Sequence, residues 1–99
     1  MTLNAINIDQ AVDADVLVKT GTGIYGGFSM LAAADATIKI YDSATVVGVS
    51  NAKMIDVGSL DIDVAGLSDH SAPVEPIKFT SGLVVVVTGV ATLATVWYK

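Results

Sequence analysis

The chain has 99 residues, of which 53% are hydrophobic and 15% are charged, and it carries a net charge of −5 with no cysteine. This length fits one domain, and the apolar composition excludes intrinsic disorder, which goes with few hydrophobic residues and high charge. All five basic residues are lysines spread singly along an acidic chain, which excludes a nucleic-acid-binding protein, because such binding rests on clustered lysine and arginine.

Helical periodicity is nearly absent, and short apolar segments recur about every 8–12 residues, which is the spacing of a β-sandwich or barrel. We expect about seven or eight strands in an antiparallel, all-β fold. The expected strands cover residues 15–19, 24–31, 37–41, 45–49, 53–57, 77–80, 83–88 and 92–98. Residues 65–76 contain both prolines and are expected to form a long loop.

Two of these strands have a detailed pattern. In residues 37–41, Ile38 and Ile40 alternate with polar residues, which predicts that both isoleucines point into the core. In residues 24–31, Ile24, Phe28 and Met30 are expected to share the buried face. The glycine pair in the middle of that strand predicts a bulge or the close approach of another backbone.

The first residues differ from the rest of the chain. In residues 1–14, the apolar side chains Leu3, Ile6 and Ile8 are interrupted by polar ones, which indicates either a first edge strand or an arm that packs on a neighbour. Residues 15–99 are then the single β-sandwich domain. The start of the chain lacks the basic segment and apolar core of a secretion signal, so we expect synthesis in the cytoplasm.

The C-terminal segment tests a membrane interpretation. Residues 83–98 are uncharged, but they fall short of the roughly 20 residues that a spanning helix needs. Their many β-branched side chains favour two strands joined by a turn at Gly89, and no membrane partner is expected.

The valines of residues 84–87 are apolar on both faces, which predicts a strand covered on both sides. This is more apolar surface than one small core needs, and such surface usually marks an interface. We therefore expect a homo-oligomer. The candidate interface residues are Leu3, Ile6, Ile8, Val84, Val86 and Trp97.

No candidate catalytic site survives inspection. His70 lies between Asp69 and Ser71, but catalytic triads are assembled from distant segments, so a solvated loop histidine is the better interpretation. The glycines of residues 20–27 are not followed by a helix, as a phosphate-binding loop requires, and fit hairpin turns instead. We expect no enzyme and no cofactor.

Two further groups of side chains have the composition of a binding site. Asp61 and Asp63 alternate near Asp69 and could offer oxygen ligands to calcium, but the spacing of a calcium loop is missing. Solvent-facing acids that block strand pairing at a sheet edge are the favoured interpretation, without a metal site. Four aromatic residues could stack on a sugar, but strand alternation places Trp97 and Tyr98 on opposite faces, so packing in a core or interface is favoured. The four are Tyr25, Tyr41, Trp97 and Tyr98.

Several short segments resemble small virion proteins of tailed bacteriophages, of the capsid decoration (cement) type. They are residues 38–42 (IKIYD), Gly48, residues 79–85 (FTSGLVV) and residues 89–98. In those proteins such segments frame a jelly-roll-like β-sandwich. The resemblance implies a protein made in the host cytoplasm and placed on the capsid surface of the virion.

The resemblance also implies a major capsid protein as partner and a homo-oligomer, most often a trimer, with residues 1–15 as an arm that contacts the shell. Two alternatives stay open. One is a carbohydrate-binding or adhesin-type β-sandwich module, with or without calcium at Asp61, Asp63 and Asp69. The other is a different small component of a phage head or tail.

Overall fold

The computed structural model describes residues 3–11, 15–31, 35–46, 51–60, 68–71, 76–89 and 92–99. These segments hold nine β-strands and one short 3-10 helix, η1. The strands are β1 (Asn4–Asp9), β2 (Asp15–Thr20), β3 (Gly23–Leu31), β4 (Ala36–Asp42), β5 (Met54–Leu60), β6 (Ser68–Ser71), β7 (Ile77–Phe79), β8 (Gly82–Thr88) and β9 (Leu93–Tyr98). The helix η1 covers Asn51–Lys53.

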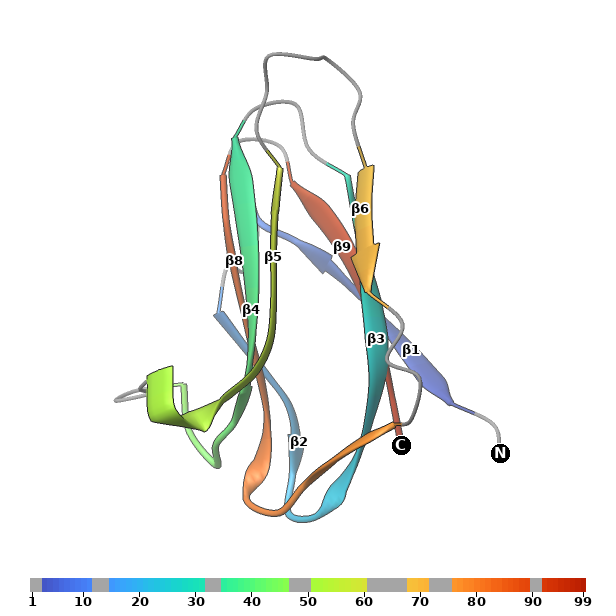
Figure 1. Ribbon diagram of the computed structural model, residues 1–99, viewed down its shortest axis with the longest axis vertical. Helices are drawn as coiled ribbons and strands as arrows, with labels where there is room; N and C mark the ends of the chain where they lie inside the picture. The colour runs from blue at the N-terminus through green and yellow to red at the C-terminus, as the bar shows by residue number, and fades with distance from the viewer. Residues whose placement is uncertain are drawn as a thin grey trace.

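The strands form two facing antiparallel sheets (Figure 1). Sheet A has the order β1-β9-β3-β6, and β7 also pairs with β3, at the end of β3 that β6 does not cover. Sheet B has the order β2-β8-β4-β5. Most successive strands therefore cross from one sheet to the other, and β1 and β9 are neighbours in sheet A, which is the arrangement of a jelly roll. The predicted all-β, jelly-roll-like sandwich is confirmed.

The core lies between the sheets because alternate side chains of each strand point inward. On β4, Ile38 and Ile40 are fully buried in this core, as their alternation predicts. On β8, Leu83, Val85 and Val87 point into it as well. The remaining buried members are Ile8, Tyr25, Phe28, Met30, Ala36, Phe79, Ala94 and Val96.

Strand β3 carries a bulge at its glycine pair. Its register against β9 shifts between Tyr25 and Gly27, and Gly27 has a φ of 127°, which a glycine adopts without strain. The predicted bulge is thus present. It also changes which side chain faces the core: Tyr25 is fully buried with Phe28 and Met30, and Ile24, which was expected there, is only partly buried.

Two expectations about loops and strands are wrong. Ser68–Ser71 form β6, which pairs with β3 inside the segment predicted to be a long loop. The sequence of this strand shows no apolar alternation, so it was not predicted. Its backbone pairing with β3 makes it an edge strand. Thr45 and Val46, expected to begin a strand, lie outside any strand, and residues 47–49 are not among those described.

The N-terminal residues join the sandwich. From Asn4 to Asp9, β1 pairs with β9 in unbroken register and forms an edge of sheet A. Of the two arrangements considered for the start of the chain, residues 4–9 adopt the edge strand.

A carboxylate closes the turn between β7 and β8. Asp42, at the end of β4, accepts hydrogen bonds from the backbone N–H groups of Thr80 (3.0 Å), Ser81 (2.8 Å) and Gly82 (3.4 Å). The Thr80 hydroxyl donates a fourth (3.3 Å). Desolvation by itself would raise the pKa of Asp42, but these hydrogen bonds favour the charged form and together hold the pKa below its ordinary value.

One hydrogen bond joins the two sheets across the core. The hydroxyl of Tyr25 on β3 donates to Oδ2 of Asp56 on β5 at 2.7 Å. Burial raises the pKa of Tyr25 well above its ordinary value, and the bond to the Asp56 carboxylate and its negative charge raise it further.

Candidate interaction surface on sheet A

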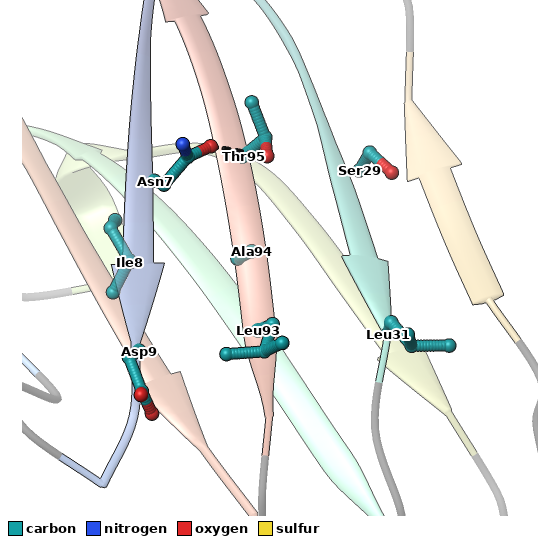
Figure 2. A pocket seen from close by; sticks show the side chains of 8 residues that line it. All are labelled: Asn7, Ile8, Asp9, Ser29, Leu31, Leu93, Ala94 and Thr95. Atoms are coloured by element: carbon teal, nitrogen blue, oxygen red, sulfur yellow. Dashed lines mark hydrogen bonds between the residues drawn. The ribbon is translucent and has the colours of Figure 1, made fainter.

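A shallow hollow of about 410 Å³ lies across β1, β9 and β3, on the face of sheet A that points away from the core (Figure 2). Its lining residues are Asn7, Ile8, Asp9, Ser29, Leu31, Leu93, Ala94 and Thr95. We call the outward-facing side chains of these strands the sheet A outer face. Ile8 and Ala94 themselves point into the core, so the other six side chains define the surface that a partner would meet.

Strand register arranges this face in rows. Asn7 lies opposite Thr95, which lies opposite Ser29, so three polar side chains cross the sheet in line. The Thr95 hydroxyl donates to Oδ1 of Asn7 at 2.8 Å, as drawn in Figure 2. This middle row offers hydroxyl and amide groups to a partner.

The next row is apolar and exposed. Leu93 lies opposite both Asp9 on β1 and Leu31 on β3. Leu31 and Leu93 are 49% and 51% exposed, and directly opposite side chains on neighbouring strands lie within contact range. Exposing two neighbouring leucines to water is unfavourable in free energy. Burying them against an apolar surface of a partner would remove this unfavourable contribution.

The other end of the face carries two of the predicted interface residues. Trp97 lies opposite Ala5 and Gly27 and is partly exposed. The Leu3 side chain lies over Gly26, at a place where a Cβ on that glycine would collide with it. Alternation along β1 puts Leu3 on the same side of the sheet as Asn7. The fold thus brings Leu3 and Trp97 onto one face, together with the two leucines that sequence reasoning did not select.

The other predicted interface residues lie elsewhere. Ile8 is 4% exposed and belongs to the core, and Ile6 packs against that core. Val84 is 0% exposed, so neither it nor Ile8 presents surface to a partner in this fold. Val86 is partly exposed on sheet B, away from Leu3 and Trp97.

The outer face of sheet B is a second apolar surface. Leu17 on β2 and Val57 on β5 are 39% and 54% exposed, near opposite edges of the sheet. Between them lie Val84 and Tyr41, which are paired with each other and buried outside the core cluster. The prediction that the valine run is covered on both faces is confirmed for Val84, Val85 and Val87.

Among the described residues, the fold does not assemble a catalytic, metal or sugar-stacking site from the candidate side chains. His70 lies in β6, with its backbone opposite Ser29, rather than in a loop. Asp61 and Asp63 lie outside the described residues, and within those residues no three metal-binding side chains come together. The sugar-stacking platform is absent, because Tyr25 and Tyr41 are 0% and 5% exposed.

Comparison with known proteins yields no relative: no protein-family model matches the chain, and no curated protein is similar to it in sequence. Among the described residues there is also no helix of the length and hydrophobicity that crossing a bilayer demands.

Proposed function

We propose that this protein is a structural component of a phage virion, a capsid decoration protein that attaches to the shell through the sheet A outer face. The major capsid protein is its partner, and the capsid surface is its location. It performs no chemistry, and its function is to hold neighbouring shell subunits together.

The observation that carries the proposal is the exposed leucine pair beside the polar row. Leu31 and Leu93 lie at one end of the sheet A outer face and Trp97 and Leu3 lie at the other, with Asn7, Thr95 and Ser29 between them. Apolar contacts flanking a few hydrogen-bonding groups are the usual composition of a protein–protein interface. None of these side chains belongs to the core between the sheets, so core packing does not explain why apolar side chains occupy these positions.

The fold and the charge support the same function. Jelly rolls recur among viral capsid proteins, although a fold by itself does not determine function. The segments that resemble phage decoration proteins include β4 and β8, which are adjacent in sheet B. A net charge of −5 helps to keep the free protein dissolved until it meets the shell.

Self-association is part of the proposal. Several weak contacts made by one oligomer add up through effective concentration, so each protomer needs only a small area on the shell. The resemblance implies a trimer, and the exposed apolar side chains on both sheets favour an oligomer without specifying its size.

The test is co-sedimentation with capsid shells assembled without this chain. We expect a major capsid gene beside the gene of this protein, and that neighbour supplies the shells. The wild-type protein should pellet with them to saturation, whereas a variant with Leu31→Asn and Leu93→Asn should stay in the supernatant. A matched variant on the other sheet, Leu17→Asn with Val57→Asn, should still pellet. A folded wild-type protein that never pellets with shells would contradict the proposal.

A carbohydrate-binding module is the second candidate, favoured by the polar lining of the hollow. Asn7, Asp9 and Thr95 place an amide, a carboxylate and a hydroxyl next to each other, as sugar hydroxyls require. Calorimetric titration with a panel of monosaccharides tests it, and melting curves with and without a chelator test the calcium version. A heat of binding that is present in the wild type and absent in Asn7→Ala would favour a carbohydrate-binding module. No detectable heat with any of the sugars would exclude it.

A further inference from the structure

Strand β1 has an unpaired backbone edge, and the direction of its hydrogen-bonding groups follows from the ladder. The Gln10 N–H donates to the Thr92 carbonyl at 3.0 Å, so residue 10 points its backbone toward β9. Hydrogen-bonding residues alternate along an antiparallel strand, and the register of β1 is unbroken. The N–H and C=O groups of Ala5, Asn7 and Asp9 therefore point away from β9, to the side where sheet A has no further strand among the described residues.

The other edges of the two sheets carry features that hinder pairing with another chain. In sheet B, β2 has charged residues at Asp15 and Lys19 and a shifted register, and β5 has a shifted register against β4. The far edge of sheet A is divided between two short strands, β6 and β7, and β7 carries an exposed Lys78. Charges, bulges and short strands are the usual protection of an edge.

Strand β1 has none of these protections along most of its length. It has six residues, regular register, no lysine and no proline, and its one charged residue, Asp9, stands at its end. An edge of this kind adds a strand readily when a partner strand is available.

We propose that β1 of one copy pairs antiparallel with β1 of a second copy across a two-fold axis at Asn7, joining their A sheets into one continuous sheet. The inference rests on the self-association in the proposed function, and it does not depend on what the shell is. A second copy is the occupant that the edge features favour, because self-pairing joins the two unprotected edges and leaves neither one exposed.

The register follows from the two faces of the strand. Only pairings that place the backbone groups pointing away from β9 opposite each other connect the free N–H and C=O groups. Among such pairings, an axis at Ile6 or at Asn7 pairs the most residues of β1. With the axis at Asn7, Ile6 lies opposite Ile8 of the second copy, so the core-facing isoleucines continue as one apolar row. With the axis at Ile6, Ile8 would lie opposite the polar Asn4, which is a poorer match.

Charge is also compatible with this register. Each copy carries a net charge of −5, so a contact between copies is favoured where few acids meet. Asp9 lies opposite Ala5 of the second copy, and the two Asp9 carboxylates are held at opposite ends of the ladder. Like charges directly opposite each other would weaken the pairing, and this arrangement avoids them.

The absence of cysteine allows a direct test by cross-linking. In Asn7→Cys, the two thiols lie opposite each other, with Cα atoms about 5.5 Å apart in a hydrogen-bonded pair, inside the range that a disulfide spans. The control Leu93→Cys is exposed and on the same face, but in the joined sheet the two copies of residue 93 are three strand spacings apart, which alone is roughly 14 Å, and they are also offset along the strands. Mild oxidation should therefore convert Asn7→Cys to a covalent dimer and leave Leu93→Cys largely monomeric.

The second test breaks the pairing while keeping the strand. Asn7→Pro removes an N–H that points away from β9, so the ladder with β9 loses no hydrogen bond, whereas a partner strand loses its donor. The control Asn7→Thr keeps the N–H. In sedimentation velocity, the wild type and Asn7→Thr should form dimers or even-numbered assemblies, and Asn7→Pro should sediment as a monomer with an unchanged circular dichroism spectrum.

The outcomes separate the inference from the proposed function. A wild-type monomer, a trimer, or an assembly that a folded Asn7→Pro leaves intact overturns β1 pairing, while binding to shells can still be present. Equal cross-linking of Asn7→Cys and Leu93→Cys also overturns β1 pairing. If Asn7→Pro fails to fold, this cross-linking experiment is the deciding test. If β1 pairing holds and no shell is bound, the proposed function fails and the inference stands.

Discussion

The Thr92 hydroxyl is a buried polar atom that makes no hydrogen bond to any described residue. The side chain is 0% exposed, and it lies against Gly89, whose φ is 128°. A buried hydroxyl without a partner loses its hydration and gains nothing in return. Among the described residues, Thr92 contributes its backbone carbonyl, which accepts from the Gln10 N–H, and its hydroxyl makes no bond, so we expect the fold not to depend on the hydroxyl.

We therefore expect Thr92→Val to stabilise the protein by about 1 kcal/mol, because valine has nearly the same shape and no group to desolvate. In thermal unfolding this corresponds to a rise in Tm of about 4–8 °C for a domain of this size. Thr95→Val is the control: the Thr95 hydroxyl donates to Asn7 on a surface, so its removal should give no rise. An unchanged or lower Tm in Thr92→Val would show that the hydroxyl is satisfied in solution.

Asp42 is the opposite case, a carboxylate whose four hydrogen bonds all favour its charged form. Its pKa is lowered in the folded state, so its contribution to stability is present above the ordinary aspartate pKa of about 3.9. It is lost as the pH falls below that value and through the folded pKa. Asp42→Asn should lose about 1 kcal/mol near neutral pH, because the amide offers one acceptor atom in place of two. Urea unfolding from pH 7 to pH 3 checks this: the difference between wild type and variant should shrink toward the acid end. A difference that stays constant over this range would contradict it.

At the scale of elements, the two sheets are tied together by the bond between Tyr25 of β3 and Asp56 of β5. Tyr25→Phe removes the donor and leaves a partly buried carboxylate facing the core, which should cost about 1–3 kcal/mol of unfolding free energy. The raised pKa of Tyr25 adds a pH dependence: stability is fully present below the ordinary tyrosine pKa of about 10 and declines above it. Unfolding measured from pH 8 to pH 11 should show a steeper decline in the wild type than in Tyr25→Phe, and parallel curves would refute the assignment.

Most strands could be predicted because they are half-buried and therefore alternate. The segments that became β2, β3, β4, β5, β8 and β9 were all expected, since inward Ile and Val alternate with polar residues or form covered runs. Strand β6 could not be predicted, because its four polar residues show no alternation. Only their pairing with β3 makes them a strand. The burial of Tyr25 in place of Ile24 likewise depends on a bulge whose position fixes which residues face inward.

The interaction surface was predicted only in part, for a related reason. Alternation alone put Leu93 and Trp97 on one side of the last strand, and this signal would have nominated Leu93. That Leu31 lies opposite Leu93, and that Leu3 reaches Gly26, are facts of strand order, which no pattern within a single strand carries. Val84 was selected wrongly because its burial, in a row between Leu17 on β2 and Tyr41 on β4, also depends on strand order.

At the scale of the whole molecule, the proposed pairing and the proposed docking face fit together. Joining two copies through β1 extends sheet A without turning it over, so both outer faces look the same way. A dimer therefore offers two hollows to one shell, and losing the dimer should weaken attachment more than halving the number of sites would, because avidity is lost.

This gives a prediction for the intact protein. Asn7→Pro should bind shells at least tenfold more weakly than Asn7→Thr, even though both keep Leu31 and Leu93 (a factor below the roughly 100- to 10,000-fold gain that linking two sites can provide). Binding isotherms from co-sedimentation, at matched protein concentration, measure the ratio. Equal affinities would mean that each copy attaches by itself.

The position of β9 between β1 and β3 also determines the order in which the fold can be completed. Asn4 pairs with Tyr98, so β1 has no neighbour among the described strands of its sheet until β9 is available. Contacts between residues this far apart in sequence slow folding, because the entropy of closing the loop is lost before the contacts form. During synthesis, which proceeds from the N-terminus, β1 must wait until β9 has been made before the two can pair. Until β9 is made, β1 therefore has no partner strand on either side. One of these two sides is the edge through which we propose that two finished copies join.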